Sequence, residues 1–257
     1  MSDFLSSEER QYNIINLLNR QGRLSVGEIV EQFKVSQATA RRDLETLVER
    51  GKLQRVHGGA IPLRQAPPEL PILQRASANA EEKGRIGNTT AALVQDGDTI
   101  LLGSGTTVAE VALALRQRKG LTVITNSLPV LNTLSGLPDI SVIALGGVFR
   151  DSELSFIGHI TEQALSEVRA DRVIIGVHAL NLEQGLTNDY IPETMTDRAI
   201  LHAGREVIVV ADHSKVNTVS TALLAPITSI HTLVTDSKTP SEFREALTAI
   251  GVRVIVA

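Results

Sequence analysis

The run Gly-Ser-Gly-Thr-Thr at 103–107 is the first place in this sequence where residue types and spacing could do chemistry. It follows the short apolar run 99–102 and precedes a helical pattern at 107–118. Glycines let backbone N–H groups approach an anion, hydroxyls add donors, and a helix N-terminus carries partial positive charge. The run predicts a phosphate-binding loop, although glycine-rich loops also serve as simple strand-to-helix turns. Its residues are Gly103, Ser104, Gly105, Thr106 and Thr107.

Polar residues or glycines also follow three other short apolar runs. In open α/β sheets, ligands bind in the crevice at the carboxyl ends of the strands, so we expect these residues to line one crevice. Lys215 could neutralise a phosphate as a point charge, or it could be a surface lysine after a turn. Asp212 could bind the ligand, or it could only stabilise the turn through its side-chain oxygen. The residues assigned to the crevice here are Asn126, Ser127, Gly146, Gly147, Asp212 and Lys215.

Four further polar residues are assigned to the same crevice. His178 and Asn181 follow a predicted strand, and Glu193 and Asp197 could accept hydrogen bonds from hydroxyl groups of a ligand. No two of the six histidines have the i, i+4 spacing of a metal site on a helix. We therefore expect no metal site and no cofactor.

Alternating strands and helices must position these residues. Seven short β-branched runs are predicted strands, at 99–102, 121–125, 141–145, 172–176, 206–210, 231–235 and 252–256. Helical patterns fit between most of them, as at 107–118 and 240–250. Nearly continuous apolar strands separated by helices indicate a mostly parallel sheet that is covered on both faces. The predicted fold class of this region is α/β.

Helix-capping signals dominate the first fifty residues. Ser6 with Glu9, and Ser25 with Glu28, have the spacing of capping boxes, and the first helix is expected to end near Gly22. Apolar residues at helical spacing follow both capping boxes. Two short helices are therefore expected before residue 34.

A third helix and a hairpin are expected next. Ser36 caps a helix whose apolar face is formed by Ala40, Leu44 and Leu47, and the helix is expected to stop at Gly51. The following segment 52–61 alternates apolar and polar residues about Gly58-Gly59, which predicts a small hairpin. Three helices followed by a hairpin are typical of a winged helix-turn-helix.

The third helix has the position of a DNA-recognition helix, because a short turn at 34–35 joins it to the second. With its apolar face turned inward, Arg42 and Ala38 point outward and Thr39 and Arg41 flank them. Arginine can bond a guanine edge or a phosphate, and alanine can contact a thymine methyl. The hairpin residues expected beside the DNA backbone are Lys52, Arg55 and His57.

The alternative is a solvated charged helix, since Arg42 lies within salt-bridge reach of Glu45 and Glu49.

Composition and charge limit the classes of function. The 257 residues include no cysteine, which excludes disulfides, zinc fingers, iron–sulfur clusters and thiol nucleophiles. The net charge is −4, but residues 1–64 carry 10 basic and 8 acidic side chains, whereas the remainder carries 15 and 21. A basic segment joined to an acidic one is expected of a protein that binds nucleic acid and has a second function in another domain. A random distribution of charge is the other explanation. With no signal sequence or membrane-length apolar run, we expect a soluble, cytoplasmic protein.

Prolines mark a boundary between the two regions. Pro62, Pro67, Pro68 and Pro71 crowd into ten residues, and proline disfavours helix in the residue before it. We expect a DNA-binding domain at 1–61, a proline-rich linker at 62–76 and an α/β sensor domain at 77–257.

The DeoR family of bacterial sugar-metabolism repressors has a signature that closely resembles residues 35–60, VSQATARRDLETLVERGKLQRVHGGA. At position 40 this sequence has alanine where the family usually has isoleucine. The smaller side chain makes fewer contacts in the core, but it does not affect Arg41 and Arg42. The resemblance covers the whole chain, and it implies that Gln37, Thr39, Arg41 and Arg42 face the operator. The complete set assigned to DNA is Ser36, Gln37, Ala38, Thr39, Arg41, Arg42, Lys52, Arg55 and His57.

The second region resembles the ribose-5-phosphate isomerase superfamily. There, a loop like 103–107 and a lysine placed like Lys215 hold the sugar phosphate, and Asp197 falls about where the catalytic base would be. The isomerase also needs an aspartate pair and a second lysine, but no acid occurs at 173–182 and no lysine occurs between Lys119 and Lys215. An enediol mechanism without these groups would lose most of its proton transfer and charge stabilisation, so we expect binding without turnover.

Together, these observations predict a DNA-binding transcriptional regulator, most simply a repressor of a carbohydrate operon, that a phosphorylated sugar releases from DNA or modulates. Its expected partners are double-stranded operator DNA, the sugar phosphate and further copies of itself, as a dimer or tetramer. The alternatives are a sugar-phosphate isomerase-like enzyme with an accessory DNA-binding domain, and a DNA-binding scaffold without a ligand.

Overall fold

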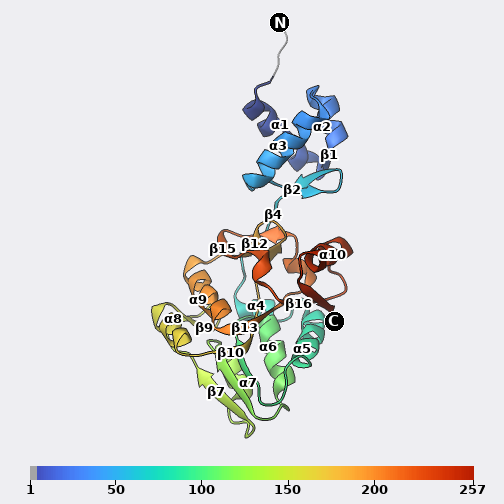
Figure 1. Cartoon of the computed structure of the whole chain (residues 1–257). Coiled ribbons are helices and arrows are strands. Elements are labelled where there is room, and N and C mark those ends of the chain that lie inside the picture. Colours follow the sequence, from blue (N-terminus) through green and yellow to red (C-terminus); the bar gives the residue numbers. More distant parts are fainter. Residues whose placement is uncertain (1–4) are drawn as a thin grey trace. The chain divides into compact units, whose positions relative to one another are not determined.

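The computed structural model describes residues 5–257, and the chain divides into two compact units between Gln65 and Ala66 (Figure 1). The first four residues of the predicted DNA-binding domain lie outside the described part. Residues 66–76, most of the segment that its prolines mark as a linker, belong to the second unit.

The N-terminal unit is a winged helix-turn-helix, as predicted. It contains α1 (Ser7–Gln21), β1 (Leu24–Ser25), α2 (Val26–Phe33), α3 (Gln37–Glu49), β2 (Leu53–Val56), β3 (Gly59–Pro62) and β4 (Arg64–Gln65). Both predicted capping boxes form, and Ser36 caps α3 by accepting a hydrogen bond from the Thr39 N–H. The first three strands make an antiparallel sheet in the order β1-β3-β2.

The hairpin turn lies one residue earlier than predicted, at His57-Gly58, because Gly59 is already part of β3. Gly58 has a φ of +78°, in the left-handed region that glycine tolerates. Gly59 pairs with Ser25, and a Cβ on it would lie 2.2 Å from the carbonyl oxygen of Leu24. The two adjacent glycines therefore serve different purposes, one in the turn and one in a close strand contact.

A buried charge joins α3, the helix predicted to read DNA, to α1. Asp43 is 3% exposed and accepts hydrogen bonds from Arg10 Nε at 2.5 Å and Gln11 Nε2 at 3.1 Å. Ser7 Oγ lies 3.4 Å from the same carboxylate. A buried carboxylate is tolerated only when it is paired and hydrogen-bonded, so these contacts fix how α3 packs on α1.

The second unit is built on a seven-stranded sheet in the order β17-β16-β13-β10-β5-β6-β7, in which every neighbouring pair is parallel. All seven strands were predicted, with ends shifted by at most two residues. They are β5 (Thr99–Leu102), β6 (Leu121–Thr125), β7 (Ile140–Ala144), β10 (Ala170–Ile175), β13 (Gly204–Val210), β16 (Thr232–Thr235) and β17 (Arg253–Val256).

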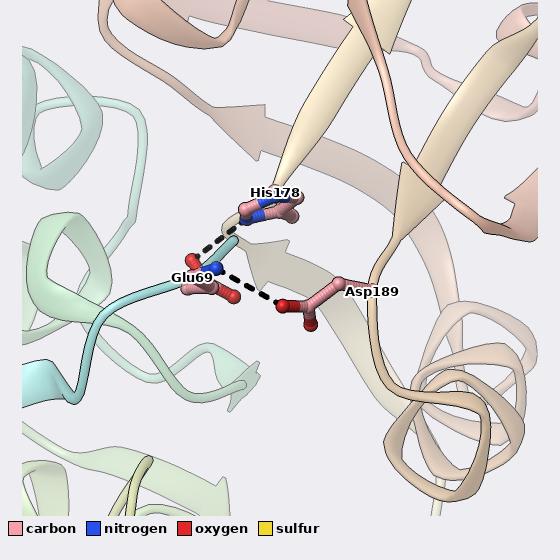
Figure 2. Close-up of side chains that lie close together, drawn as sticks. All are labelled: Glu69, His178 and Asp189. Atoms are coloured by element: carbon pink, nitrogen blue, oxygen red, sulfur yellow. Dashed lines mark hydrogen bonds and ion pairs between the residues drawn. The ribbon is translucent and has the colours of Figure 1, made fainter. Parts of the chain in front are cut away.

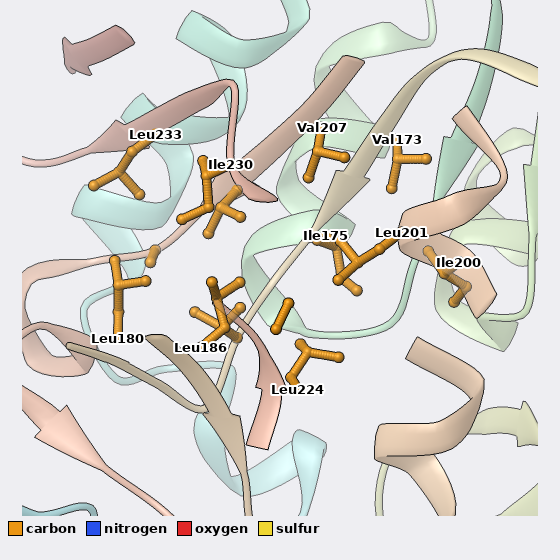
Figure 3. Close-up of a cluster of buried hydrophobic side chains, with 14 of the residues drawn as sticks. Val173, Ile175, Leu180, Leu186, Ile200, Leu201, Val207, Leu224, Ile230 and Leu233 are labelled. Carbon is orange, nitrogen blue, oxygen red and sulfur yellow. The ribbon is translucent and has the colours of Figure 1, made fainter. Parts of the chain in front are cut away.

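Helices cover both faces of this sheet, because neighbouring residues of each central strand face opposite cores. Ile174 packs in the core with α5 (Ala80–Ala91), α6 (Thr106–Leu115) and α7 (Leu128–Leu134). Val173 and Ile175 pack in the other core, part of which is shown in Figure 3. That core also receives side chains from α8 (His159–Ser166), α9 (Ile191–His202) and α10 (Ser241–Ala249).

Short antiparallel elements were not predicted as such. The strands β11 (Ala179–Asn181), β12 (Gly185–Asn188) and β15 (Ala222–Ala225) form a small sheet, and β8 (Val148–Arg150) pairs with β9 (Ser155–Ile157). The remaining elements are α4 (Ile72–Arg75), β14 (Thr218–Val219) and the 3₁₀ turns η1 (His213–Lys215) and η2 (Ile227–Ser229). These segments follow or precede the main strands and supply much of the candidate site.

Within residues 5–257, none of the helices combines the length and apolar character required to cross a bilayer.

Replacing Asp43 by alanine should destabilise the N-terminal unit by about 3 to 5 kcal/mol, because Arg10 then loses its buried partner. Denaturant unfolding monitored by far-UV circular dichroism should show an earlier transition for this unit. Glu45→Ala, an exposed change on the same helix, is the control, and equal unfolding midpoints for both variants would contradict the assigned role of Asp43.

Candidate functional site

The outer surface of α3 and the hairpin carries the residues assigned to DNA. Arg41 and Arg42 are exposed and form no ion pair with any residue in the described chain, an arrangement that fits both a DNA-binding face and the alternative of a solvated charged helix. Ser36 and Thr39 contribute to the helix cap. Of the nine, Ser36, Gln37, Ala38, Arg41, Arg42, Lys52 and His57 are exposed, and Thr39 and Arg55 are half-buried.

A cavity of about 130 Å³ lies in the second unit at the carboxyl ends of β5, β10 and β13. In sequence order, β5, β6 and β7 follow one another toward one edge of the sheet, whereas β10, β13, β16 and β17 follow one another toward the other edge. The winding therefore reverses between β5 and β10, and such a switch point is where open α/β sheets leave a crevice. Of the predicted site residues, the cavity is lined by Ser104, Gly105, Thr106, Thr107, His178, Glu193, Asp197, Asp212 and Lys215.

Positive groups gather at one end of this cavity. Gly105, with a φ of +114°, precedes the first turn of α6, and no side chain caps that helix. Lys215, from the turn after β13, lies beside it among the lining residues, together with Arg75 and Lys83. Uncapped helix amides and basic side chains are the groups that bind a phosphoryl anion.

Glu69 meets the basic groups inside the cavity. Its Oε1 atom lies 2.5 Å from Arg75 Nη1, 3.2 Å from His178 Nδ1 and 3.6 Å from Lys215 Nζ. Figure 2 shows that His178 and Asp189 approach Glu69 from the same side, and the Glu69 N–H donates to Asp189 Oδ2 at 3.1 Å. Burial raises the pKa of the Glu69 carboxyl, but His178, Arg75 and Lys215 together outweigh it and lower the pKa to about 2.

Carboxylates and amides also line the cavity. Asn188 Nδ2 donates to Asp197 Oδ2 at 2.8 Å, and its Oδ1 accepts from the His178 N–H at 3.4 Å. Burial raises the pKa of Asp197 well above its ordinary value, and the neighbouring Glu193 raises it further. Burial likewise raises the pKa of Glu193 to about 7, although Arg150 pairs with it. Such groups can exchange hydrogen bonds with sugar hydroxyls.

Asp212 serves the turn as well as the cavity. Its Oδ1 accepts from the Ser214 N–H at 2.9 Å and from Asn79 Nδ2 at 3.1 Å. The turn that Asp212 stabilises is the one that carries Lys215.

Six other predicted residues lie outside the cavity lining, and they are Gly103, Asn126, Ser127, Gly146, Gly147 and Asn181. Asn126 Nδ2 donates to the Phe156 carbonyl, and Ser127 caps α7. These two residues follow β6, and the two glycines at 146 and 147 follow β7. Both strands lie beyond β5, away from the switch point. Asn181 Oδ1 accepts the Glu183 and Gln184 N–H groups.

Several lining residues were not predicted from the sequence. Glu69 and Arg75 lie in the proline-rich segment and α4, Asn79 and Lys83 at the start of α5, and Glu153 between β8 and β9. The sequence analysis selected residues that directly follow predicted strands of the main sheet. None of these five positions does so. The proline-rich segment held no motif that would point to a pocket.

Two groups of three potential metal ligands come together through the fold. Glu69, His178 and Asp189 form one, and Asp212, His213 and Asp236 form the other, each with ligand atoms within 4.8 Å of one another. The first group already pairs with Arg75 and Lys215, whose charges oppose a divalent cation. In the second, His213 Nδ1 lies 3.1 Å from both oxygens of Asp236.

Comparison with known proteins gives two matched domain families. Residues 10–66 match the DeoR-like helix-turn-helix domain, and residues 78–237 match the DeoR C terminal sensor domain. The transcriptional repressor AccR of Agrobacterium fabrum is 37% identical over 237 residues, which are 92% of this chain and 92% of that protein. The glycerol-3-phosphate regulon repressor of Escherichia coli is 34% identical over 244 residues, or 95% and 96% of the two chains.

Among solved structures, ribose 5 phosphate isomerase A from Neisseria gonorrhoeae is 18% identical, covers 53% of each chain and has a TM-score of 0.40. A likeness this weak carries no argument about the site.

The raised pKa of Glu193 predicts a pH dependence of stability. The folded state holds this proton more tightly than the unfolded chain, so the free energy of unfolding should fall as pH rises from about 4.5 to about 7. Glu193→Gln should remove on the order of 1 to 3 kcal/mol of this decline. Denaturant unfolding at several pH values would measure it. The exposed Glu167→Gln is the control, and an unchanged pH profile for Glu193→Gln would contradict the prediction.

Proposed function

The chain belongs to the DeoR family, and on that premise we propose that it is a transcriptional repressor whose N-terminal unit binds operator DNA and whose cavity in the second unit binds a phosphorylated sugar. The names of the relatives support repression, and one of them is a repressor of a glycerol 3-phosphate regulon. Both matched domain families occur in this chain in the order expected of such a repressor.

The exposed basic pair Arg41 and Arg42 supports the DNA-binding part of the proposal. Both side chains are free of intramolecular ion pairs among residues 5–257, so their charges are available to guanine edges or phosphates. Lys52 and His57 are exposed on the adjacent hairpin, where they can contact the DNA backbone. Two copies related by a two-fold axis would match an inverted-repeat operator, so the active form proposed is at least a dimer.

The observation that carries the sugar-phosphate part is that the cavity lining combines two chemically different sets of groups. One set is the N-terminus of α6 with Lys215, Lys83 and Arg75. The other is Asn188 with the carboxyl groups of Glu193 and Asp197. A phosphorylated sugar carries both an anion and hydroxyl groups, which matches these two sets.

The proposed role of the cavity is binding and not turnover. Counting back from Lys215 along the sequence, Asp197 falls about where the base of an isomerase would be, and burial and Glu193 raise its pKa. The aspartate pair and the second lysine of the isomerases have no counterpart at 173–182 or between Lys119 and Lys215. Without these groups, an enediol mechanism would lose most of its proton transfer and charge stabilisation.

Replacing Arg41 and Arg42 together by alanine should weaken operator binding at least tenfold, since each arginine contact with a base is worth about 1 to 3 kcal/mol. Fluorescence anisotropy with the DNA upstream of the encoding gene, at physiological salt, would measure the affinity. Arg20→Ala, an exposed arginine at the end of α1, should change it little. Unchanged affinity in the double variant would refute the assigned role of α3.

A phosphorylated sugar that binds the cavity should stabilise the second unit. At 100 times its dissociation constant, a ligand adds about 2.7 kcal/mol, or a rise in Tm of about 5 to 10 °C. A thermal-shift screen of phosphorylated sugars with the full chain would identify it, and Lys215→Ala should abolish the shift while the exposed Lys119→Ala keeps it. If no compound in the screen raises the Tm, the ligand-binding part of the proposal fails.

A further inference from the structure

Glu69 occupies the place in the cavity where an anionic ligand would be held. One oxygen of this carboxylate contacts Arg75, His178 and Lys215, which are three of the positive or proton-donating groups at that end. The Glu69 side chain is 10% exposed, and Lys215 forms no other ion pair in the described chain. A carboxylate of the protein thus already satisfies the charges that an incoming phosphoryl group needs.

The cavity is small while Glu69 remains there. Its volume of about 130 Å³ is below the range of about 300 to 1,000 Å³ that is general for ligand pockets. Movement of Glu69 would enlarge it. Glu153 also lines the cavity and pairs with Arg75, but Glu69 is the carboxylate that contacts Arg75, His178 and Lys215 together.

The segment that carries Glu69 has few other attachments. Ala66 donates its N–H to the Val219 carbonyl at 2.8 Å, and Ile72 donates its N–H to the Ser152 carbonyl at 2.7 Å. Between them the residues at 67, 68 and 71 are prolines, which have no N–H to donate, and Leu70 is 57% exposed. The Pro71 carbonyl accepts hydrogen bonds from the Gln74 and Arg75 N–H groups, so Pro71 is anchored to α4. Within the described second unit, 67–70 is held by the side-chain contacts of Glu69 and by the hydrogen bond from the Glu69 N–H to Asp189.

We infer that Glu69 is an internal occupant of the anion subsite, that the phosphoryl group of the ligand displaces it from Arg75 and Lys215, and that the segment 67–70 loses these side-chain attachments and is released to move when this happens. The inference rests on the proposed function, because it concerns the ligand of the same cavity. A phosphoryl dianion carries about twice the charge of a carboxylate, so it competes favourably for the two cations. The released segment begins two residues after Gln65, the last residue of the N-terminal unit, so ligand binding changes the chain that leads to the DNA-binding unit.

An internal competitor weakens the apparent binding of the ligand. The apparent Kd equals the intrinsic Kd divided by the fraction of ligand-free molecules in which the competitor is out of the site. Glu69→Gln removes the charge but keeps the shape, so it should bind inorganic phosphate at least tenfold more tightly than the wild-type chain. Isothermal titration of the full chain with inorganic phosphate at constant ionic strength measures this. Glu81→Gln removes an equal charge from an exposed position near the start of α5 and should bind phosphate as the wild type does.

Hydrogen–deuterium exchange of the wild-type chain gives a second readout that needs no variant. Phosphate should raise exchange in the peptide 66–75, and in Glu69→Gln exchange there should be high without phosphate. If phosphate binds the wild type and Glu69→Gln equally and exchange at 66–75 does not change, the inference is overturned and the anion site of the proposed function stands.

Two further outcomes would also overturn the inference. If Glu81→Gln gains as much affinity as Glu69→Gln, the gain is a general charge effect and Glu69 is not a specific competitor. If phosphate binds neither the wild type nor Glu69→Gln, both the anion site of the proposed function and this inference fail.

Discussion

Parallel pairing of all seven main strands places their carboxyl ends on one edge of the sheet, and the site depends on that constraint. The winding reverses between β5 and β10, so the helices that follow these strands diverge to opposite faces and leave an opening. The start of α6 and the turn that carries Lys215 both reach this opening. Residues from α4, α5 and the β8–β9 hairpin complete the cavity, although they precede or interrupt the regular strand–helix order.

Charge balance governs what the cavity can accept. Buried charges are tolerated when they are paired, and Arg75 is paired with both Glu69 and Glu153, while Arg150 is paired with Glu193. On the proposed function, an anionic ligand would exchange one partner of a basic group for another, and it would not simply add charge to an empty pocket. This exchange would link binding to the position of a chain segment, because Glu69 lies on the proline-rich stretch.

In the N-terminal unit, the inner face of α3 is packed tightly while its outer face remains exposed to solvent. Asp43 and the apolar residues Leu44 and Leu47 fix the inner face of α3. The outer face presents Arg41 and Arg42 to solvent. Its own hydrophobic core and the buried pair between Asp43 and Arg10 stabilise this unit from within.

Local patterns in the sequence determined the elements: both capping boxes, the Ser36 cap, the seven strands and the two-part α/β architecture follow from spacing and apolar periodicity over a few residues. They also placed Ser104, Thr106 and Lys215 in one crevice, because those residues directly follow strands. Only the tertiary structure decided that β6 and β7 end away from the cavity, that Asp43 is a buried anchor, and that Glu69 and Arg75 enter the site. Those facts depend on strand order and on contacts between segments tens of residues apart, for which neither periodicity nor a local motif carries a signal.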